Sequence, residues 1–154
     1  MQKIILNNRR LRFSAFEDGE GPIVLCLHGF PDNYHSYDQQ IPALLRAGYR
    51  VVVPMMRGYE PQSQPADGDY HLNHMVEDVI AWIDQLGEQK VHLVGHDWGA
   101  IVGYLTANTA PDRLHSLTTF AIAPLQGLPD AVRQNPRQIL LSWYTMFFQL
   151  RGLS

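Results

Sequence analysis

One segment constrains the fold of this chain more than any other, Gly95-His96-Asp97-Trp98-Gly99-Ala100. It directly follows an apolar run at residues 91–94 and opens a helix of small residues. A buried strand, a sharp turn flanked by glycines and a helix together are typical of a nucleophile elbow in an α/β sheet. The segment therefore predicts an α/β fold with Asp97 in the nucleophile position.

Asp97 occupies the position where most such elbows carry serine. A carboxylate that attacks a saturated carbon forms an ester, which water can later hydrolyse through the ester carbonyl. A serine attacking the same carbon would leave an ether, which water does not readily cleave. Asp97 therefore indicates alkyl transfer rather than acyl transfer. The competing interpretation is an aspartate that only caps the following helix.

The composition limits the class of protein and its partners. Of the 154 residues, 45% are hydrophobic and 18% are charged, as in one globular domain with a sizeable core. The net charge of -3 without basic clusters disfavours nucleic acids and anionic membranes as partners. Cys26 is the single cysteine, and its apolar surroundings predict a buried strand position. Because there is no signal-peptide pattern and no apolar run of ~20 residues, we expect a cytoplasmic protein.

Strands and helices are predicted to alternate along residues 1–123. A hairpin comes first, with strands at residues 3–6 and 11–16 separated by Asn7-Asn8. Apolar runs typical of parallel strands buried on both faces follow at residues 23–27, 49–53, 91–94 and 117–122. Helices are predicted at residues 37–47, 73–86 and 99–110. This order predicts a mostly parallel, doubly wound sheet with an N-terminal antiparallel hairpin.

Residues 124–154 are predicted to form a second part of the chain, the beginning of a helical lid. Breakers at Gly127, Pro129 and Pro136 precede a helix at residues 138–150 that is apolar on most sides. Its aromatic side chains fit a lid over a cleft and a plain core helix equally well; they are Trp143, Tyr144, Phe147 and Phe148.

Four segments together resemble the epoxide hydrolases of the α/β-hydrolase family. They are His28-Gly29-Phe30-Pro31, Arg57-Gly58-Tyr59, residues 95–99 and residues 142–149. The resemblance implies an α/β-hydrolase fold and favours a cis Phe30–Pro31 bond. The chain departs from the family pattern at Met55, usually acidic, and at Glu60, usually glycine. These two changes bear on the conformation of that loop rather than on the chemistry.

The resemblance also implies roles for individual residues. Asp97 would be the nucleophile, the backbone N–H groups of Phe30 and Trp98 would form the oxyanion hole, and the Tyr144 phenol would donate to the epoxide oxygen. The substrate-binding residues would be His28, Pro31, Trp98, Trp143 and Phe148. The substrate would be a small apolar epoxide, with water as the second reactant. No cofactor is implied, and the histidine spacing predicts no metal site.

The catalytic set is incomplete within these residues. In this fold an acid and then a histidine follow the nucleophile, but only His115 lies downstream of Asp97, between the end of one helix and the next strand. We therefore expect the acid and the base beyond residue 154, with the sheet ending before its last strands. The strand at residues 117–122 would then be an exposed edge, which predicts self-association.

Two other functions remain open at this point. A haloalkane dehalogenase also uses an Asp-Trp elbow, although many of these enzymes carry a side-chain amide where this chain has Phe30. The chain could also be a noncatalytic half-domain that pairs with another polypeptide.

Overall fold

The computed structural model describes residues 1–124, 127, 130 and 133–137. The chain forms two compact units, residues 1–122 and 123–154. The strands of the first unit are β1 (Gln2–Asn8), β2 (Leu11–Asp18), β3 (Ile23–Leu27), β4 (Arg50–Pro54), β5 (Val91–His96) and β6 (Leu114–Phe120). Its α-helices are α1 (Ile41–Arg46), α2 (Leu72–Gln85) and α3 (Trp98–Thr109), and its 3-10 turns are η1 (Tyr34–Tyr37), η2 (Pro61–Ser63) and η3 (Pro111–Arg113). The predicted lid helix at residues 138–150 lies outside the described residues.

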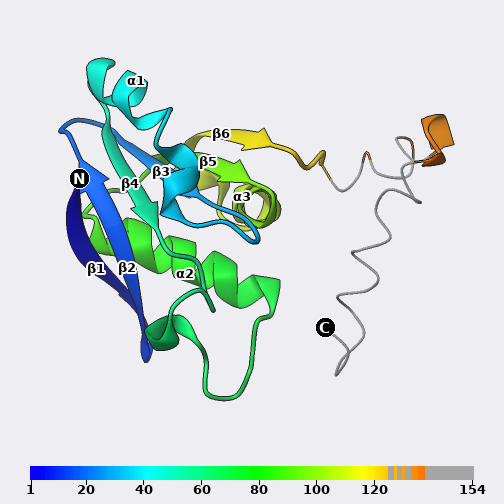
Figure 1. The fold of residues 1–154 in the computed structure, drawn as a ribbon, viewed down its shortest axis with the longest axis horizontal. Helices are drawn as coiled ribbons and strands as arrows, with labels where there is room; N and C mark the ends of the chain where they lie inside the picture. Colours follow the sequence, from blue (N-terminus) through cyan, green and yellow to red (C-terminus); the bar gives the residue numbers. More distant parts are fainter. Residues whose placement is uncertain (125–126, 128–129, 131–132, 138–154) are drawn as a thin grey trace. The chain divides into compact units, whose positions relative to one another are not determined.

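The six strands form one mixed sheet in the order β1-β2-β4-β3-β5-β6 (Figure 1). β1 and β2 pair antiparallel, as do β2 and β4. The pairs β3–β4, β3–β5 and β5–β6 are parallel. The predicted antiparallel hairpin followed by a parallel, doubly wound sheet is confirmed.

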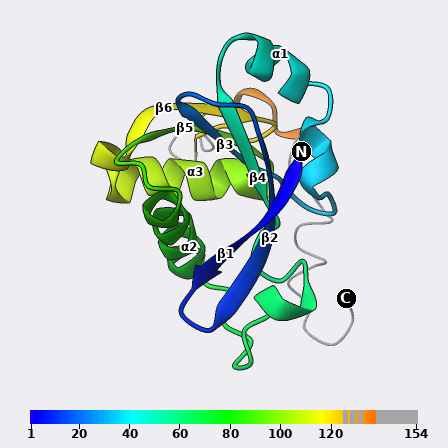
Figure 2. The ribbon, with the colours of Figure 1, turned by 90° about the vertical axis from the view of Figure 1, so that its left-hand side faces the viewer.

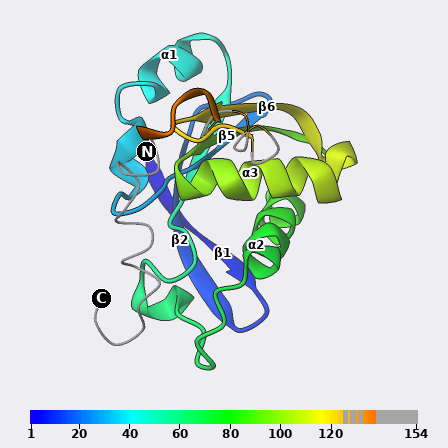
Figure 3. The same cartoon turned by 90° about the vertical axis from the view of Figure 1, so that its right-hand side faces the viewer.

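Both faces of the sheet are covered. Helices α2 and α3 lie against one face (Figure 3), and α1 lies beside β4 on the other (Figure 2). In β3, which is buried throughout, Ile23, Leu25 and Leu27 enter the core under α2 and α3, whereas Val24 and Cys26 enter the opposite core. The continuous apolar run thus serves two cores, because successive side chains of a strand point to opposite faces.

Helix α2 is amphipathic, as predicted. Val76, Val79, Trp82 and Ile83 are buried, and the Trp82 ring packs edge-on against Phe13 at a centroid distance of 5.0 Å. This stripe fixes α2 beneath the hairpin. Among the described residues, no helix is long and apolar enough to cross a membrane.

The hairpin turn and the first helix differ from the prediction. The turn is at Arg9, which has a φ of 53°, because Asn7 and Asn8 remain in β1 through hydrogen bonds to α2. The predicted helix at residues 37–47 is instead η1 followed by α1. Pro42 lies in the first turn of α1, where its missing N–H is tolerated; deeper in one long helix it would remove a hydrogen bond.

The last strand is also displaced from its predicted position at residues 117–122. It begins at Leu114, directly after η3, and ends at Phe120 because Ala121 adopts a left-handed φ of 70°. His115 was expected before this strand but lies inside it. Within residues 1–124, β6 pairs only with β5. Self-association through this edge remains a prediction.

Candidate active site

Asp97 forms the turn between β5 and α3. Its φ of 53° and ψ of -117° are rarely adopted by a residue with a side chain. Its carbonyl accepts the N–H groups of Ala100 and Ile101 and so begins α3. The Asp97 side chain makes no capping hydrogen bond to the helix, and the capping interpretation is therefore not supported.

Two close approaches allow this turn. A Cβ on Gly99 would lie 2.1 Å from the Leu27 carbonyl oxygen, and a Cβ on Gly29 would lie 2.3 Å from the Asp97 Cβ. Both distances are far below a normal contact. Only glycine at these two positions lets the end of β3 and the β5–α3 turn meet.

The loop after β3 supplies a hydrogen-bond donor to the Asp97 carboxylate. The Phe30 N–H donates to Asp97 Oδ1 at 2.8 Å, and the Phe30–Pro31 bond is cis, as the resemblance favoured. Within residues 1–124, the Trp98 N–H makes no hydrogen bond to this carboxylate, and its role remains a prediction. The Trp98 side chain is 42% exposed beside it.

His28 fixes the loop after β3 through hydrogen bonds to backbone groups. Its Nε2 accepts the Met56 N–H at 3.0 Å, so the proton is assigned to Nδ1, which donates to the Gly29 carbonyl at 3.0 Å. Burial lowers the pKa of His28, which keeps the ring neutral. Both ring nitrogens of His28 are occupied by backbone groups, and its predicted contact with substrate stays a prediction. The structure gives it a positioning role.

Tyr59 supports the same carbonyl, a contact that the sequence analysis missed. Its hydroxyl donates to the Gly29 carbonyl at 3.1 Å, and its ring packs edge-on against His28. Burial raises the pKa of Tyr59 to about 12, which keeps the phenol protonated. The Asp32 N–H also donates to this carbonyl, at 3.1 Å, and the three donors together fix the peptide that presents the Phe30 N–H to Asp97.

A buried ion pair anchors the loop after β4. Arg57 Nε and Nη2 donate to the two carboxylate oxygens of Asp78, each at 2.8 Å, and the Asn8 side chain donates to Oδ1 at 2.7 Å. Burial raises the pKa of Asp78, and the Arg57 guanidinium opposes this effect. Arg-Gly-Tyr was part of the sequence motif, but nothing in the sequence indicated Asp78 as the partner.

The loop also accommodates the two departures from the family pattern. The Glu60 N–H donates to Ser63 Oγ at 3.1 Å, and the Glu60 carboxylate accepts the Ser14 N–H at 2.8 Å, while Glu60 keeps an ordinary extended backbone with a φ of -132°. The Met55 N–H donates to the Ser14 carbonyl at 2.8 Å. Both residues therefore tie the loop to β2.

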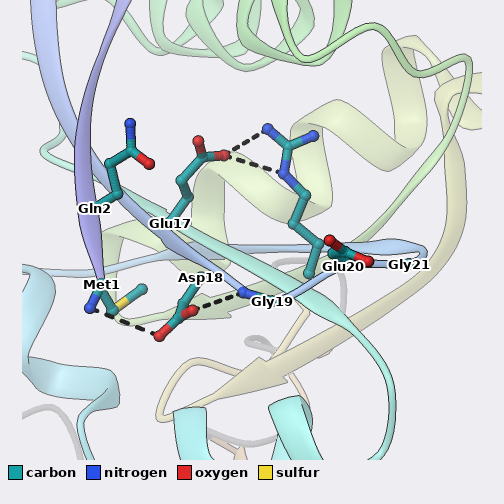
Figure 4. Close-up of a pocket in the computed structure, with 8 residues that line it drawn as sticks. Met1, Gln2, Glu17, Asp18, Gly19, Glu20 and Gly21 are labelled. Atoms are coloured by element: carbon teal, nitrogen blue, oxygen red, sulfur yellow. Dashed lines mark hydrogen bonds and ion pairs between the residues drawn. The ribbon is translucent and has the colours of Figure 1, made fainter.

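A cavity of about 330 Å³ opens beside Trp98. It is lined by His28, Met56, Arg57, Tyr59, Tyr70, His71, Leu72, Met75 and Trp98. A second hollow, of about 500 Å³, lies where β3 and β4 begin (Figure 4). There Arg50 pairs with Glu17, and the Met1 ammonium lies 3.6 Å from Asp18. Arg50, Glu17 and Asp18 are already paired, and this hollow lies at the end of the parallel strands opposite Asp97, so the cavity beside Trp98 is the better candidate site.

The other predicted site residues have different outcomes. Pro31 is exposed next to the cis bond. Trp143, Tyr144 and Phe148 lie outside the described residues. His115 packs against His92 near the beginning of β5, at the end of the strand opposite Asp97, which agrees with its exclusion as the base. Within the described residues, no group of three potential metal ligands comes together.

Comparisons with known proteins identify the relatives of this chain. A family model described as alpha/beta hydrolase fold matches residues 22–151. Epoxide hydrolase B of Mycobacterium tuberculosis is 43% identical over 136 residues, which cover 82% of this chain and 38% of that protein. Epoxide hydrolase 3 of Siraitia grosvenorii is 37% identical over 123 residues, covering 79% and 39% respectively.

Solved structures give the same result. The crystal structure of epoxide hydrolase VrEH1 from Vigna radiata matches with a TM-score of 0.76 and 38% identity, covering 80% of this chain and 41% of that one. The chain spans between 38% and 41% of the length of these three relatives.

Proposed function

Because this chain belongs to the α/β hydrolase family and is similar to its epoxide hydrolases, we propose that it carries the nucleophile of an enzyme that hydrolyses epoxides to diols. Asp97 is the nucleophile, and the intermediate is an alkyl ester on its carboxylate. The acid and the water-activating histidine are expected beyond residue 154.

The hydrogen bond from the Phe30 N–H to Asp97 Oδ1 carries this proposal. It assigns different tasks to the two carboxylate oxygens. Oδ1 stays with its donor and becomes the carbonyl oxygen of the ester, whereas Oδ2 attacks carbon. When water later attacks the ester carbonyl, negative charge develops on the oxygen that already has a donor in place.

Alkylation of Asp97 opens the epoxide ring. Oδ2 attacks one epoxide carbon, the C–O bond of the ring breaks, and its electron pair moves to the departing oxygen. The resulting alkoxide is basic and takes a proton, for which Tyr144 is the proposed donor. Hydrolysis then cleaves the bond between the Asp97 carbonyl carbon and Oδ2, and it releases the diol.

The first step needs no base, and this makes it testable on the chain itself. Incubation with a terminal epoxide, followed by peptide mass spectrometry, is expected to show an adduct on Asp97 with the mass of the intact epoxide. The Asp97→Asn variant is the matched control, since it keeps the shape of the side chain and removes the charge. An unmodified Asp97 peptide in the unsubstituted chain would refute the proposal.

A haloalkane dehalogenase is the second candidate because the exposed Trp98 indole beside Asp97 offers an N–H donor to a departing halide. A primary chloroalkane tested in parallel separates the two. Faster adduct formation with the epoxide supports epoxide opening. Faster formation with the chloroalkane, accompanied by chloride release, supports dehalogenation. No adduct with either compound favours a noncatalytic half-domain.

A further inference from the structure

We propose that Tyr104 is a positioning residue for Asp97, and that it acts through the turn that follows β6. This inference rests on the proposed function and adds to it a residue that controls the orientation of the nucleophile. The Asp97 backbone N–H donates to the Phe120 carbonyl at 3.3 Å. Asp97 is therefore bonded to the loop after β3 through its side chain and to the end of β6 through its backbone.

The Tyr104 hydroxyl holds both ends of the segment that contains Phe120. Tyr104 lies on α3, and its hydroxyl oxygen is 2.6 Å from Thr119 Oγ1 and 3.0 Å from the Ile122 carbonyl oxygen. Because a carbonyl can only accept, the phenol donates to Ile122, and the Thr119 hydroxyl donates to the phenol oxygen. One hydroxyl group thus joins the residue before Phe120 to the end of the turn that follows it.

The turn between these two hydrogen bonds has an unfavourable backbone conformation. Ala121 directly follows Phe120, is exposed, and adopts a φ of 70°, which is uncommon for a residue with a side chain. Such a conformation persists only where surrounding contacts hold it in place. The two hydrogen bonds of Tyr104 lie on either side of Ala121, and the phenol therefore fixes the direction of the Phe120 carbonyl.

The Phe120 carbonyl in turn completes the support of the nucleophile. The Asp97 carbonyl is held by the first turn of α3, and Oδ1 is held by the Phe30 N–H. The bond to Phe120 fixes the Asp97 N–H, so weakening it lets the peptide before Asp97 rotate and changes the direction in which Oδ2 points. A displacement of ~1 Å at a reacting centre can lower a rate by ~100-fold.

The test removes single hydroxyl groups. Tyr104→Phe removes the phenol oxygen and keeps the ring, and Thr119→Val removes only the donor to that oxygen. Thr119→Ser keeps the donor and is the conservative variant. Thr106→Val is the matched control, because it removes a buried hydroxyl group from the same helix, where Thr106 Oγ1 donates to the Val102 carbonyl at 2.8 Å.

Rates of Asp97 adduct formation at a fixed concentration of a terminal epoxide measure the effect on the chemistry. We expect Tyr104→Phe to lower the rate by about tenfold, which is less than the loss that a ~1 Å displacement can cause. Thr119→Val should lower the rate by a smaller factor, because the phenol still donates to Ile122. Thr119→Ser and Thr106→Val are expected to react as fast as the unsubstituted chain.

Amide hydrogen exchange, followed by NMR, distinguishes positioning from a general loss of stability. In Tyr104→Phe, the Asp97 amide proton is expected to exchange faster, whereas the amide protons of β3 keep their rates. A general loss of stability would speed exchange at both places. If Tyr104→Phe does not fold, Thr119→Val provides the same comparison.

The two measurements separate this proposal from the proposed function. If the unsubstituted chain forms no adduct, the proposed function fails, and exchange at Asp97 still shows whether Tyr104 holds its backbone. If adducts form and Tyr104→Phe reacts as fast as the unsubstituted chain, Tyr104 does not position the nucleophile and the alkylation chemistry stands. A slower reaction without faster exchange at Asp97 would overturn the part assigned to the Phe120 carbonyl.

Discussion

A left-handed turn occurs at each end of the parallel strands, but a different type of residue adopts it at each end. Where β3 begins, the chain turns through Gly21, which has a φ of 105°. Where β5 ends, a left-handed turn is made by Asp97, with a φ of 53°. The first position uses the residue that adopts such a backbone without strain, and the second does not.

The ion pairs at the two ends of the strands differ in how far they are buried. At the beginning of β4, Arg50 and Glu17 pair on the surface, with side chains 30% and 19% exposed. Beyond the end of β4, Arg57 and Asp78 pair with side chains only 6% and 1% exposed. Strain and buried charge are both costly, and both occur at the end where the chain places its proposed nucleophile.

The largest expected effect tests the two ion pairs against each other. Arg57→Ala leaves Asp78 buried without its cation and should lower the free energy of unfolding by about 3–5 kcal/mol. Arg50→Ala, the matched change at the other end, should cost about 0–1 kcal/mol. Urea unfolding of both variants measures the difference. Equal losses would show that the two ends do not differ in this respect.

The second effect concerns close packing at the β5–α3 turn. Gly99→Ala places a methyl group against the Leu27 carbonyl and should cost about 3 kcal/mol, because backbone must move to admit it. Gly48→Ala is the control, since no atom of the described part of the chain lies within 4 Å of its added Cβ. At its φ of 83°, the control should cost about 1 kcal/mol from backbone strain alone. If Gly99→Ala unfolds at the same urea concentration as Gly48→Ala, the close approach of Gly99 to the Leu27 carbonyl does not limit stability.

The third effect isolates the strain at Asp97. Asp97→Gly and Asp97→Ala both remove the carboxylate, and they differ only in the Cβ at a left-handed position. The glycine variant should therefore be more stable than the alanine variant by about 1 kcal/mol. At an ordinary backbone position, glycine is the less stable of the two. If Asp97→Gly is less stable than Asp97→Ala, the backbone at residue 97 is not strained.

The sequence was sufficient for the elements whose pattern is local. The apolar run of β3, the stripe of α2 and the turn at Asp97 lie where predicted, because each depends on residues that are neighbours in the chain. The predicted position of the hairpin turn was wrong because Asn8 is held in β1 by a hydrogen bond to Asp78, which lies 70 residues away in the chain. Local pattern carries no information about that contact.

In the candidate site, too, the residues in local motifs were predicted and their contacts with distant residues were not. Asp97 and the loop of Phe30 follow from motifs, whereas the contacts that orient them do not. The resemblance marked Arg57 and Tyr59 but not their partners, Asp78 and the Gly29 carbonyl. The motif likewise identifies His28 without showing that its ring nitrogens bond to backbone groups.

The smallest expected effect also separates the two ends, through pH. His74 lies between two carboxylates on the loop and helix beyond β4, with Nε2 2.9 Å from Asp69 and Nδ1 3.1 Å from Glu77. The hydrogen bond to Glu77 and the charge of Asp69 raise the pKa of His74, whereas desolvation and the charge of Arg9 oppose this rise. Among the described residues, no histidine lines the hollow where β3 and β4 begin.

The sign of the dependence follows from the raised pKa. His74 binds its proton more tightly in the folded chain, so its contribution to stability is complete below its ordinary pKa of 6.5 and is lost as pH rises through the raised value. The stability advantage of the unsubstituted chain over His74→Gln should therefore be largest near pH 6 and shrink toward pH 9. Glu17→Gln, which weakens the surface pair at the other end, should show a difference that is constant over this range. If the His74→Gln difference is equally constant, the two carboxylates do not act on a charged histidine, and the two ends of the sheet respond to pH alike.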